Sequence, residues 1–553
     1  MDDATQLDWL YAHERERADS IWLSQPMGAG VVRDFTFAEG MREARCIAAY
    51  LRSLDLPAGS RIGLFSKNTA WWLLADLAIW MSGHVTVPVY PTLTPKSIRG
   101  ILEHAEVRLV LVGKLDGFAA MEPGLPDVPR VTMPLAPKEA KRDGVRAWED
   151  LLEEHKPIED SPRRAPDDLA TIVYTSGSTG DAKGVMHSFR SMCAAAALAE
   201  EFGITAQDRM LSYLPLAHVA ERACLETPNF KIGFHVFFAE SLETFAVDLR
   251  RARPTIFGSV PRLWQKLQSG VFSKMAPGRL ALLLKLPVVR GIIRQKVRQG
   301  LGLDASRTFI TGSAPTPPEL VRWYDALGME LRELYGMTEN FAISHCARAG
   351  EARIGWVGTP APGVTTKLSE DGEVLVKSPG TMVGYYKNQA LTRETIDEEG
   401  FLHTGDRGEI DDKGALRIKG RVKEIFKTSK GKYVAPAPLE SALLAHPDIE
   451  QACVSGVGLP QPYALVVLSP SLRARSAKER TGIEALLETH LREMNAAFDQ
   501  HERVDKLLVV SEEWTAENGL LTPTLKLRRA LIEERYAERV PKLMERDGRV
   551  VWL

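Results

Sequence analysis

Alternation of strand-like and helix-like segments in the first third of the chain constrains the fold most. Short apolar runs, typical of buried strands, are separated by helical patterns of ten or more residues. The strands are expected at 61–65, 85–89 and 107–112, and the helices at 37–54, 71–82 and 94–104. Such alternation predicts βαβ units around a largely parallel sheet. A proline-rich, charged stretch at 123–166 is expected to be a surface connection.

The composition is that of a large globular protein. The chain has 553 residues, of which 44% are hydrophobic and 26% are charged. These fractions exclude disordered, collagen-like, coiled-coil and small disulfide-rich classes. At roughly 150 residues per domain, the length predicts three to four domains, or one composite body with a smaller partner. A formal net charge of −2 offers no global electrostatic basis for binding nucleic acid.

Several features predict a cytoplasmic protein. The five cysteines lie far apart without a CxxC pair, which indicates free thiols in a reducing compartment rather than a zinc site or disulfides. The N-terminus is acidic and polar, so we expect no signal peptide. The most apolar long window, 71–89, is interrupted by Asp76 and His84, which favours a buried helix followed by a strand over a membrane span.

The pattern changes toward the last third of the chain. Turn sequences flank short strand patterns at 373–377 and 408–418, which predicts an antiparallel, β-barrel-like region. A dense basic loop at 421–432 indicates a boundary. We therefore expect an α/β fold: a large N-terminal body of packed αβ subdomains plus the β region, 1–420, and a smaller α+β C-terminal domain, 421–553.

A glycine-rich loop follows the apolar run at 170–174. It reads TSGSTG from Thr175 to Gly180 and is followed by Lys183. In such a loop, backbone N–H groups converge on an anion while hydroxyls and the lysine add donors and charge. It is neither a Walker A loop, because Ala182 precedes the lysine, nor a GxGxxG motif. A surface turn is the alternative, but the flanking strand and the lysine favour phosphate binding.

The segment YTSGSTGDAKGV resembles the signature loop of the adenylate-forming (AMP-binding) superfamily, which includes acyl-CoA synthetases, luciferases and peptide-synthetase adenylation domains. The resemblance covers about residues 30–530. It implies that the loop holds the β- and γ-phosphates of ATP and that the C-terminal domain is mobile. The loop residues concerned are Thr175, Ser176, Gly177, Ser178, Thr179, Gly180 and Lys183.

Two further turns match motifs of this superfamily. A turn of small residues follows the strand at 308–310, and by itself it is more typical of packing than of a site. The resemblance implies that this turn lies along the adenine of ATP. Its matching residues are Gly312, Ser313 and Ala314.

The second turn, YGMTE, places an aromatic ring, a hydroxyl and a carboxylate close together. Its residues resemble the family's YGxTE motif. The resemblance implies that Tyr335, beside Gly336, stacks on adenine. It also implies that Thr338 contacts the α-phosphate or acyl-adenylate and that Glu339 binds Mg²⁺.

Matches continue across the expected boundary and into the C-terminal domain. The resemblance implies that Asp406 binds the ribose hydroxyls and that Arg421 contacts the nucleotide. It places Lys423 at the hinge and Gly431 along a tunnel for the thiol substrate. Lys526 matches the lysine that bridges the carboxylate and phosphate during adenylation, although without the resemblance it would read as the start of a solvated basic helix.

Three segments resemble the long-chain fatty acyl-CoA synthetase branch. They are VPVYPT at 87–92, LPLAHVAER at 214–222 and SVPRLWQK at 259–266. Within the second segment, His218 is the expected pocket-side catalytic residue, with a satisfied structural histidine as the alternative.

The segment 274–307 combines basic and aliphatic residues. It holds eight Lys or Arg and one acid, Asp304, interleaved with Leu, Val and Ile. A basic amphipathic stretch can lie on an anionic membrane surface, so peripheral contact at the inner face of a membrane is one expectation. A solvated face packed on the body is the other.

The expected activity is ATP-dependent formation of acyl-AMP from a fatty acid, followed by transfer to the thiol of CoA. ATP, Mg²⁺ and CoA are the expected cofactor and co-substrates, and nucleic acid is not an expected partner. No protein nucleophile is required, which agrees with the absence of a G-x-S-x-G motif. The alternatives are loading of a carrier protein, activation of an aryl or other acid, and a nucleotide-binding protein that has lost catalysis.

Overall fold

A parallel α/β sheet forms the centre of the N-terminal body. The computed structural model describes residues 3–176, 182–522 and 526–553. In this part of the chain the central sheet has eight strands in the order β19-β9-β8-β4-β3-β5-β6-β7. Their bounds are β3 (Arg61–Phe65), β4 (Val85–Val89), β5 (Leu109–Val112), β6 (Arg130–Thr132), β7 (Arg146–Ala147), β8 (Leu169–Ser176), β9 (Ala182–Ser188) and β19 (Gly384–Tyr385). Strands β3 to β8 pair in parallel, whereas β9 and β19 are antiparallel, so the predicted parallel sheet is confirmed.

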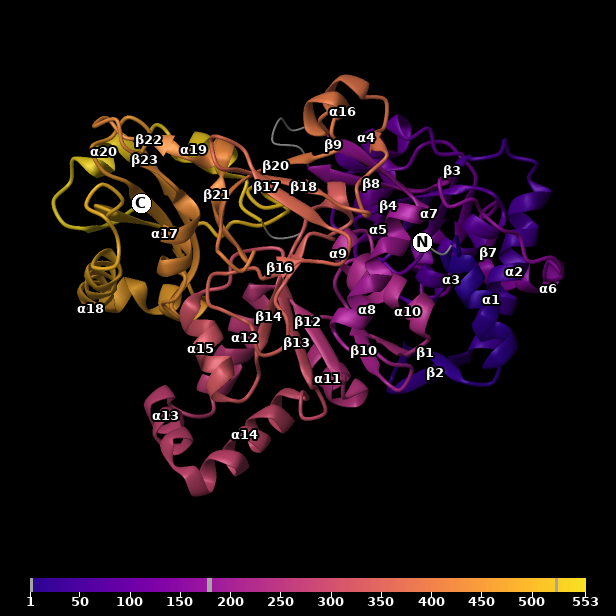
Figure 1. Ribbon diagram of the computed structural model, residues 1–553, viewed down its shortest axis with the longest axis horizontal. Coiled ribbons are helices and arrows are strands. Elements are labelled where there is room, and N and C mark those ends of the chain that lie inside the picture. The colour runs from indigo at the N-terminus through magenta and orange to yellow at the C-terminus, as the bar shows by residue number, and fades with distance from the viewer. Residues whose placement is uncertain (1–2, 177–181, 523–525) are drawn as a thin grey trace.

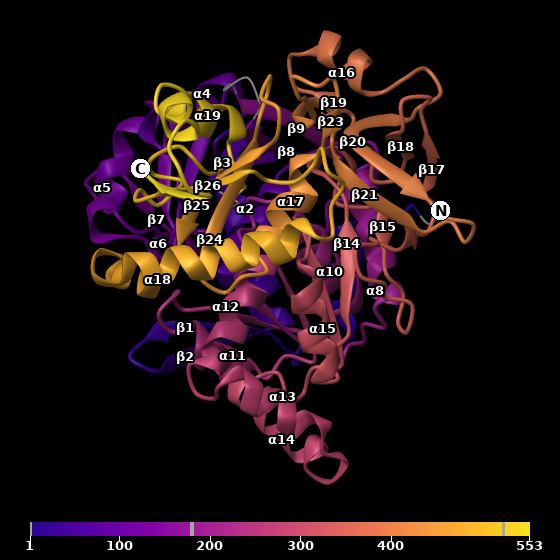
Figure 2. The same cartoon turned by 90° about the vertical axis from the view of Figure 1, so that its left-hand side faces the viewer.

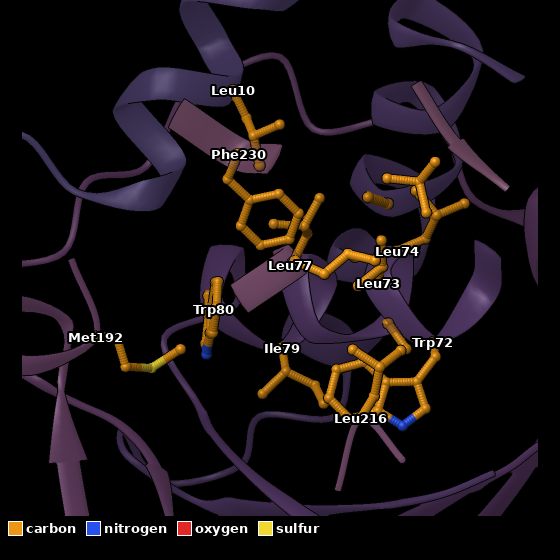
Figure 3. Close-up of a cluster of buried hydrophobic side chains, with 14 of the residues drawn as sticks. Leu10, Trp72, Leu73, Leu74, Leu77, Ile79, Trp80, Met192, Leu216 and Phe230 are labelled. Atoms are coloured by element: carbon orange, nitrogen blue, oxygen red, sulfur yellow. The ribbon is translucent and has the colours of Figure 1, made fainter. Parts of the chain in front are cut away.

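The predicted helices between these strands are confirmed as α2 (Phe37–Ser53), α3 (Ala70–Met81) and α4 (Pro95–His104). Each begins after a threonine whose side chain accepts a hydrogen bond from a backbone N–H of the first turn. Every residue of α3 is buried, as expected for a helix enclosed by the body. Figure 3 shows this core, where the Trp80 and Phe230 rings meet edge to face at 6.3 Å between centroids.

Asp76, the acid that interrupts the apolar window, has a buried basic partner. Its carboxylate pairs with Arg222, which also binds the Glu226 carboxylate at 2.6 Å and the Thr171 hydroxyl at 2.9 Å. A buried charge is tolerated only when it is paired and hydrogen-bonded in this way. The network therefore ties α3 to the segment that follows His218.

The stretch 123–166 is more structured than the surface connection we expected. It supplies β6 and β7 at one edge of the central sheet and the helix α6 (Trp148–Glu154). The indole of Trp148 is buried and donates to the Glu43 carboxylate at 3.0 Å. The prolines and charged residues of this stretch led us to expect a surface loop, but both are also common in strands at the edge of a sheet.

The body contains two smaller sheets besides the central one and the β region described below. The first has the order β10-β11-β1-β2 and the second β12-β13-β14-β15-β16. Their bounds are β1 (Ile21–Gly28), β2 (Val31–Thr36), β10 (Arg209–Ser212), β11 (His235–Phe238), β12 (Ile256–Ser259), β13 (Thr308–Gly312), β14 (Leu331–Tyr335), β15 (His345–Cys346) and β16 (Thr359–Pro360).

Helices pack around these sheets (Figure 1). The remaining helices of the body are α1 (Gln6–Glu16), α5 (Phe118–Met121), α7 (Phe189–Cys193), α8 (Ala197–Glu201), α9 (Val219–Glu221), α10 (Thr227–Ile232), α11 (Phe245–Ala252), α12 (Pro261–Phe272), α13 (Pro277–Lys285), α14 (Pro287–Leu301), α15 (Pro318–Ala326) and α16 (Gln389–Thr395).

The predicted antiparallel β region is an open sheet, and the barrel-like shape we expected is wrong. Its order is β17-β18-β20-β21, with all pairs antiparallel. Within the described residues, β17 and β21 do not pair with each other, and β21 is instead bridged at Leu416 to Gly358, which precedes β16. Hairpin signals predict neighbouring strands, but they do not determine whether the ends of a sheet close. The bounds are β17 (Thr365–Leu368), β18 (Glu373–Lys377), β20 (Leu402–Ile410) and β21 (Leu416–Arg421).

The smaller C-terminal domain has its own sheet, in the order β24-β25-β26-β27, and its own apolar core. Figure 1 shows it at the left of the body, and Figure 2 shows α18 crossing its front. None of the helices within the described ranges is long and apolar enough to cross a membrane. The domain's elements are β22 (Phe426–Lys427), β23 (Tyr433–Val434), α17 (Pro436–Leu443), β24 (Ile449–Ser455), β25 (Tyr463–Leu468), α18 (Pro470–Asn495), β26 (Lys506–Val510), α19 (Arg529–Tyr536), α20 (Val540–Met544) and β27 (Val550–Trp552).

Candidate active site

A large cleft of about 1370 Å³ is lined by both the body and the C-terminal domain. It brings together predicted residues that lie far apart in the sequence. Those in its lining are Thr175, Lys183, His218, Gly312, Ser313, Gly336, Thr338, Glu339, Arg421, Lys423 and Lys526. Convergence of several cations, hydroxyls and one small-residue turn on a single cleft is what binding of a polyanion requires.

The other predicted residues differ in their placement. Tyr335 and Asp406 are not among the lining residues, but each adjoins one in the sequence, Gly336 and Gly405, and they are bonded to each other. Ala314 and Gly431 are not among the residues that line the cleft, although Lys427 of the same basic loop is. Ser176 ends β8, paired with Ala182. Gly177, Ser178, Thr179 and Gly180 lie outside the described residues.

The β8–β9 hairpin positions the two described ends of the glycine-rich loop. Thr175 on β8 is paired with Lys183 on β9, so the hydroxyl and the ammonium belong to neighbouring positions at one end of the central sheet. The Lys183 ammonium lies 5.6 Å from the centroid of the Tyr385 ring, a cation–π distance that holds the side chain over the cleft.

Two glycines of the cleft lining are required where backbone segments approach each other closely. A Cβ on Gly312 would lie 2.6 Å from the Leu334 carbonyl oxygen, and a Cβ on Gly336 would lie 2.4 Å from the Ala342 carbonyl carbon. The Leu334 backbone is fixed by strand pairing in β14, and the Ala342 backbone belongs to the turn that follows this strand. Moving either one would disrupt the local structure. Ser313 then takes a left-handed conformation with φ of +68°, which turns the chain into the cleft.

Thr338 is held by a buried histidine that the motifs did not identify. The Nε2–H of His187 donates to the Thr338 carbonyl at 2.8 Å. Burial lowers the pKa of His187 to about 4, so the ring is neutral at physiological pH. His187 follows the glycine-rich loop on β9, and its sequence gave no sign of this contact because the two residues are 151 positions apart.

Asp406 is bonded on both oxygens. The Tyr335 hydroxyl donates to Oδ2 at 2.6 Å, and Nε of Arg421 lies 2.8 Å from Oδ1. Antiparallel pairing of β20 with β21 places Asp406 directly opposite Arg421. Burial raises the pKa of Asp406, while the guanidinium and the hydroxyl oppose that rise. A carboxylate has about four acceptor positions, so Asp406 can still accept from two ligand hydroxyls.

Glu339 is the acidic residue of the YGMTE turn, and its Oε1 accepts from the Tyr385 hydroxyl at 2.8 Å. Among the described residues no group of three or more His, Cys, Asp or Glu is arranged to hold a metal ion. A single oriented carboxylate such as Glu339 fits Mg²⁺, which retains waters and is bound through one or two carboxylates plus substrate phosphates.

Lys526 reaches the cleft from the C-terminal domain. A β-bridge between Leu521 and Leu527 and a bond from its own backbone N–H to the Thr522 hydroxyl, 3.0 Å, hold its turn. The side chain is open to the solvent of the cleft but surrounded by protein atoms. This desolvation and the Arg421 guanidinium lower the pKa of Lys526, against the attraction of Asp406 and Glu339.

His218 lies at the cleft and also makes a structural hydrogen bond. It lines the cleft, and its Nδ1 accepts from the Ala220 backbone N–H at 3.1 Å, which caps α9. Burial and the nearby Lys526 ammonium lower the pKa of His218 to about 3. The ring is therefore neutral, and because Nδ1 accepts, the proton lies on Nε2.

One lobe of the cleft is apolar. Its lining comes from β10, α9 and the helical turn that follows it, β12, β13, β14 and the turn after β14. The residues are Met210, Leu211, Val219, Leu225, Ile256, Phe257, Ile310, Leu334 and Ala342. Glu221 borders this lobe. Burial raises its pKa to about 8, although the Ser212 hydroxyl donates to it at 2.8 Å, so at pH 7 the acid is mostly neutral. The motifs did not predict this lobe, because its shape depends on how separate sheets pack.

Family comparisons agree with these features. The model described as AMP-binding enzyme matches residues 12–386, and that described as AMP-binding enzyme C-terminal domain matches 423–547. The chain is 30% identical to a long-chain-fatty-acid–CoA ligase, FadD15, of Mycobacterium bovis, covering 97% of this chain and 96% of that one. It is 29% identical to the peroxisomal long chain acyl-CoA synthetase 6 of Arabidopsis thaliana, covering 98% and 85%.

Solved structures share the fold at lower identity. The anthranilate CoA ligase AuaEII in complex with anthranoyl-AMP matches with a TM-score of 0.80 and 22% identity, over 98% of both chains. The A-PCP didomain of a carboxylic acid reductase from Segniliparus rugosus in complex with AMP matches with a TM-score of 0.81 and 22% identity, over 99% of this chain and 82% of that one. At this identity the likeness establishes the fold alone.

Proposed function

The chain belongs to the AMP-binding enzyme family, and we propose that it activates a long-chain fatty acid with ATP and transfers the acyl group to CoA. The observation that carries the proposal is that Lys526 lies in one cleft with Thr338, Glu339 and Lys183, beside an apolar lobe. Polar groups for a nucleotide and an apolar space for an acyl chain thus adjoin. The named functions of the curated relatives support the same acid and acceptor.

In the first half-reaction the acid carboxylate attacks the α-phosphate of ATP, and pyrophosphate leaves. Two anions must be brought together, so preorganised cations and donors supply most of the catalysis. We assign Lys526 and Thr338 to binding of the carboxylate and the α-phosphate. We assign the glycine-rich loop and its lysine, residues 175–183, to binding of the departing pyrophosphate. His218, neutral and with its proton on Nε2, donates toward the reacting carboxylate without adding charge.

The remaining residues position the nucleotide. We assign the 312–314 turn and Tyr335 to the adenine, Asp406 to the ribose hydroxyls and Arg421 to the nucleotide phosphate. Glu339 would hold Mg²⁺ together with the ATP phosphates, and the ion would supply Lewis-acid polarisation of the phosphoryl group. The orientation of Glu339 by Tyr385 supports this assignment.

In the second half-reaction the thiol of CoA attacks the acyl-AMP carbonyl and AMP leaves, so the protein supplies no nucleophile. We propose that the C-terminal domain, 421–553, rotates about Lys423 between the two half-reactions, a conformational step that reassembles the site. Gly431 would then line the thiol path. Gly431 is not among the lining residues in the present arrangement, which is compatible with this proposal.

The acceptor and the acid have alternatives within the family. A carboxylic acid reductase whose adenylation domain shares this fold is linked to a carrier domain, so transfer to a carrier-protein thiol is the second candidate. Activation of an aryl acid is a third candidate, and the number of aliphatic side chains in the cleft lining argues against it. A catalytically inactive nucleotide-binding protein is disfavoured because Lys526, Glu339 and Lys183 are all retained.

We place the enzyme in the cytoplasm. All five cysteines are free thiols, which suits a reducing compartment. Peripheral contact with a membrane would give it access to fatty acid, and the chain's basic helical segment is the part to test.

A thiol-acceptor assay tests the proposed function. Purified protein is given ATP, Mg²⁺ and acids of increasing chain length, with either CoA or a phosphopantetheinylated carrier protein. The proposal expects AMP and acyl-CoA, with long-chain acids preferred. Product on the carrier alone would favour the second candidate, and no acid-dependent pyrophosphate release would favour the inactive protein.

A further inference from the structure

The basic segment 274–307 folds into a helical arm. Helices α13 and α14 form a hairpin that projects from the body beyond α11, as both views show (Figures 1 and 2). We refer to residues 274–301 as the arm. It contributes nothing to the cleft lining, so the cleft chemistry does not account for it.

One side of the arm attaches it to the body. Leu284 of α13 and Val297 of α14 pack against the core cluster that includes Leu301. Arg294 also faces the body, because its Nε donates to the Ala326 carbonyl at 2.9 Å. The arm is therefore seated in a defined orientation, and its other side is available for a partner.

The outer side carries exposed aliphatic side chains. Val288 and Ile292, one turn apart on α14, are 88% and 56% exposed, and Leu282 on α13 is 62% exposed. Leu286, between the helices, is exposed as well. Isolated exposed aliphatics are ordinary, but a group concentrated on one projecting hairpin is typical of an interaction surface.

Cations border this aliphatic group. On α13, Arg279 and Lys285 are each three residues from Leu282, and on α14 Lys296 is four residues from Ile292, so each shares a helix face with an aliphatic side chain. These cations are exposed, and the described contacts of the chain include no ion pair or side-chain hydrogen bond for them. Lys274 and Arg290 are in the same situation.

The only acid in the segment does not neutralise these cations. Asp304 lies after α14 and pairs with Arg253 at 2.7 Å. By contrast, Arg298 bonds the Ser306 carbonyl and Arg307 pairs with Asp208 at 2.8 Å. Body-facing arginines are thus satisfied within the fold, whereas the outer cations have no counter-charge among the residues that the structure describes.

We propose that the arm docks on an anionic phospholipid surface, with Leu282, Val288 and Ile292 entering the headgroup region and the outer cations contacting lipid phosphates. Juxtaposed aliphatic and basic side chains match the interfacial zone of a bilayer, which offers both an apolar and an anionic layer. A nucleic-acid backbone would satisfy the cations alone. The inference goes beyond the proposed function and does not depend on it.

Vesicle co-sedimentation of the full chain tests the arm. The probes are vesicles of phosphatidylcholine alone and of phosphatidylcholine mixed with phosphatidylglycerol. Wild-type protein is expected to sediment with the mixed vesicles, less with the neutral ones, and less at high salt because the charge contribution is screened. Equal sedimentation with both kinds of vesicle, sedimentation with neither, or binding to double-stranded DNA without binding to mixed vesicles would overturn the proposal.

Two variants separate the charge and apolar contributions. Each of two triple variants is expected to weaken partitioning into mixed vesicles at least about tenfold. The first reverses charges: Arg279→Glu, Lys285→Glu and Arg290→Glu. The second replaces aliphatic side chains: Leu282→Ser, Val288→Ser and Ile292→Ser. Both variants should retain wild-type secondary structure and cleft activity, since no substituted side chain lines the cleft. Unchanged partitioning of both variants would contradict the proposal.

Matched control variants lie on the C-terminal domain. Arg492→Glu with Lys542→Glu and Arg546→Glu reverses three exposed cations on α18 and on or just after α20. Leu486→Ser removes an aliphatic side chain that is exposed on α18. These controls are expected to sediment like wild type. Loss of partitioning equal to that of the arm variants would show that net charge, rather than the arm, determines binding.

Discussion

Arg262 on α12 and Glu450 on β24 form an ion pair, with Nη2 2.9 Å from Oε1, that joins the body to the C-terminal domain. One helical turn along α12, Nε2 of Gln265 donates to the Leu444 carbonyl at 3.1 Å. Both contacts exist in the arrangement that also places Lys526 in the cleft. They therefore stabilise the orientation that we assign to adenylation.

Breaking this ion pair is expected to shift the balance between the two half-reactions. Because the pair is partly exposed, Arg262→Ala should slow acyl-AMP formation by only about two- to fivefold, while thioester formation from supplied acyl-AMP is unchanged or faster. Single-turnover measurement of each half-reaction checks this. Arg253→Ala, which removes an ion pair within the body, is the control, and equal slowing of both half-reactions by Arg262→Ala would contradict the assignment.

His187 is expected to act as a positioning residue. In His187→Ala the Thr338 carbonyl loses its buried donor, which should cost about 1–3 kcal/mol of stability and lower kcat more than it raises KM. His187→Gln retains an amide donor and should recover part of kcat. If both variants lose stability equally but keep wild-type kcat at a temperature where they are folded, the residue has only a structural role.

Glu221 is expected to make stability depend on pH. Its folded-state pKa is raised to about 8, against about 4.3 for an unfolded chain. The fold favours the neutral acid. Its contribution to the free energy of unfolding is therefore complete below about pH 4 and is lost as the pH rises toward 8. The free energy of unfolding of Glu221→Gln should therefore rise by at least about 1 kcal/mol relative to that of wild type between pH 5 and pH 8. Denaturant unfolding at several pH values checks this, and a pH-independent difference would refute it.

Gly336 is expected to tolerate no side chain. Gly336→Ala would place a methyl group against the Ala342 backbone, displacing the turn that carries Thr338 and Glu339, and ATP–pyrophosphate exchange should fall by about two orders of magnitude. Gly270→Ala on α12 is the matched control, since nothing lies within 4 Å of its Cβ position. It should retain activity and gain slightly in stability because alanine favours a helix. Equal behaviour of the two variants would contradict the close-approach argument.

Local sequence patterns predicted much of the body. The strands at 61–65, 85–89 and 373–377 begin and end at the predicted residues, because alternation and turn residues are local signals. The resemblance to a family predicted which distant residues meet in the cleft, including Lys526 and Thr338. No local pattern relates these residues to each other.

What could not be predicted depends on tertiary packing. The contact between His187 and Thr338 and the neutral state of Glu221 arise from burial by elements far away in the sequence. That β17 and β21 do not pair to close the sheet was missed for the same reason. In 274–307 the composition predicted a basic amphipathic surface, but only the fold separates Arg294, which faces the body, from Arg290, which faces solvent.

The most direct test of the account measures both half-reactions of Lys526→Ala. Acyl-AMP formation is followed by acid-dependent ATP–pyrophosphate exchange, and thioester formation by transfer from supplied acyl-AMP to CoA. If Lys526 bridges the carboxylate and the α-phosphate, exchange should fall by about two to three orders of magnitude, while thioester formation remains within about twofold of wild type. Equal loss of both half-reactions, or wild-type exchange, would contradict the account.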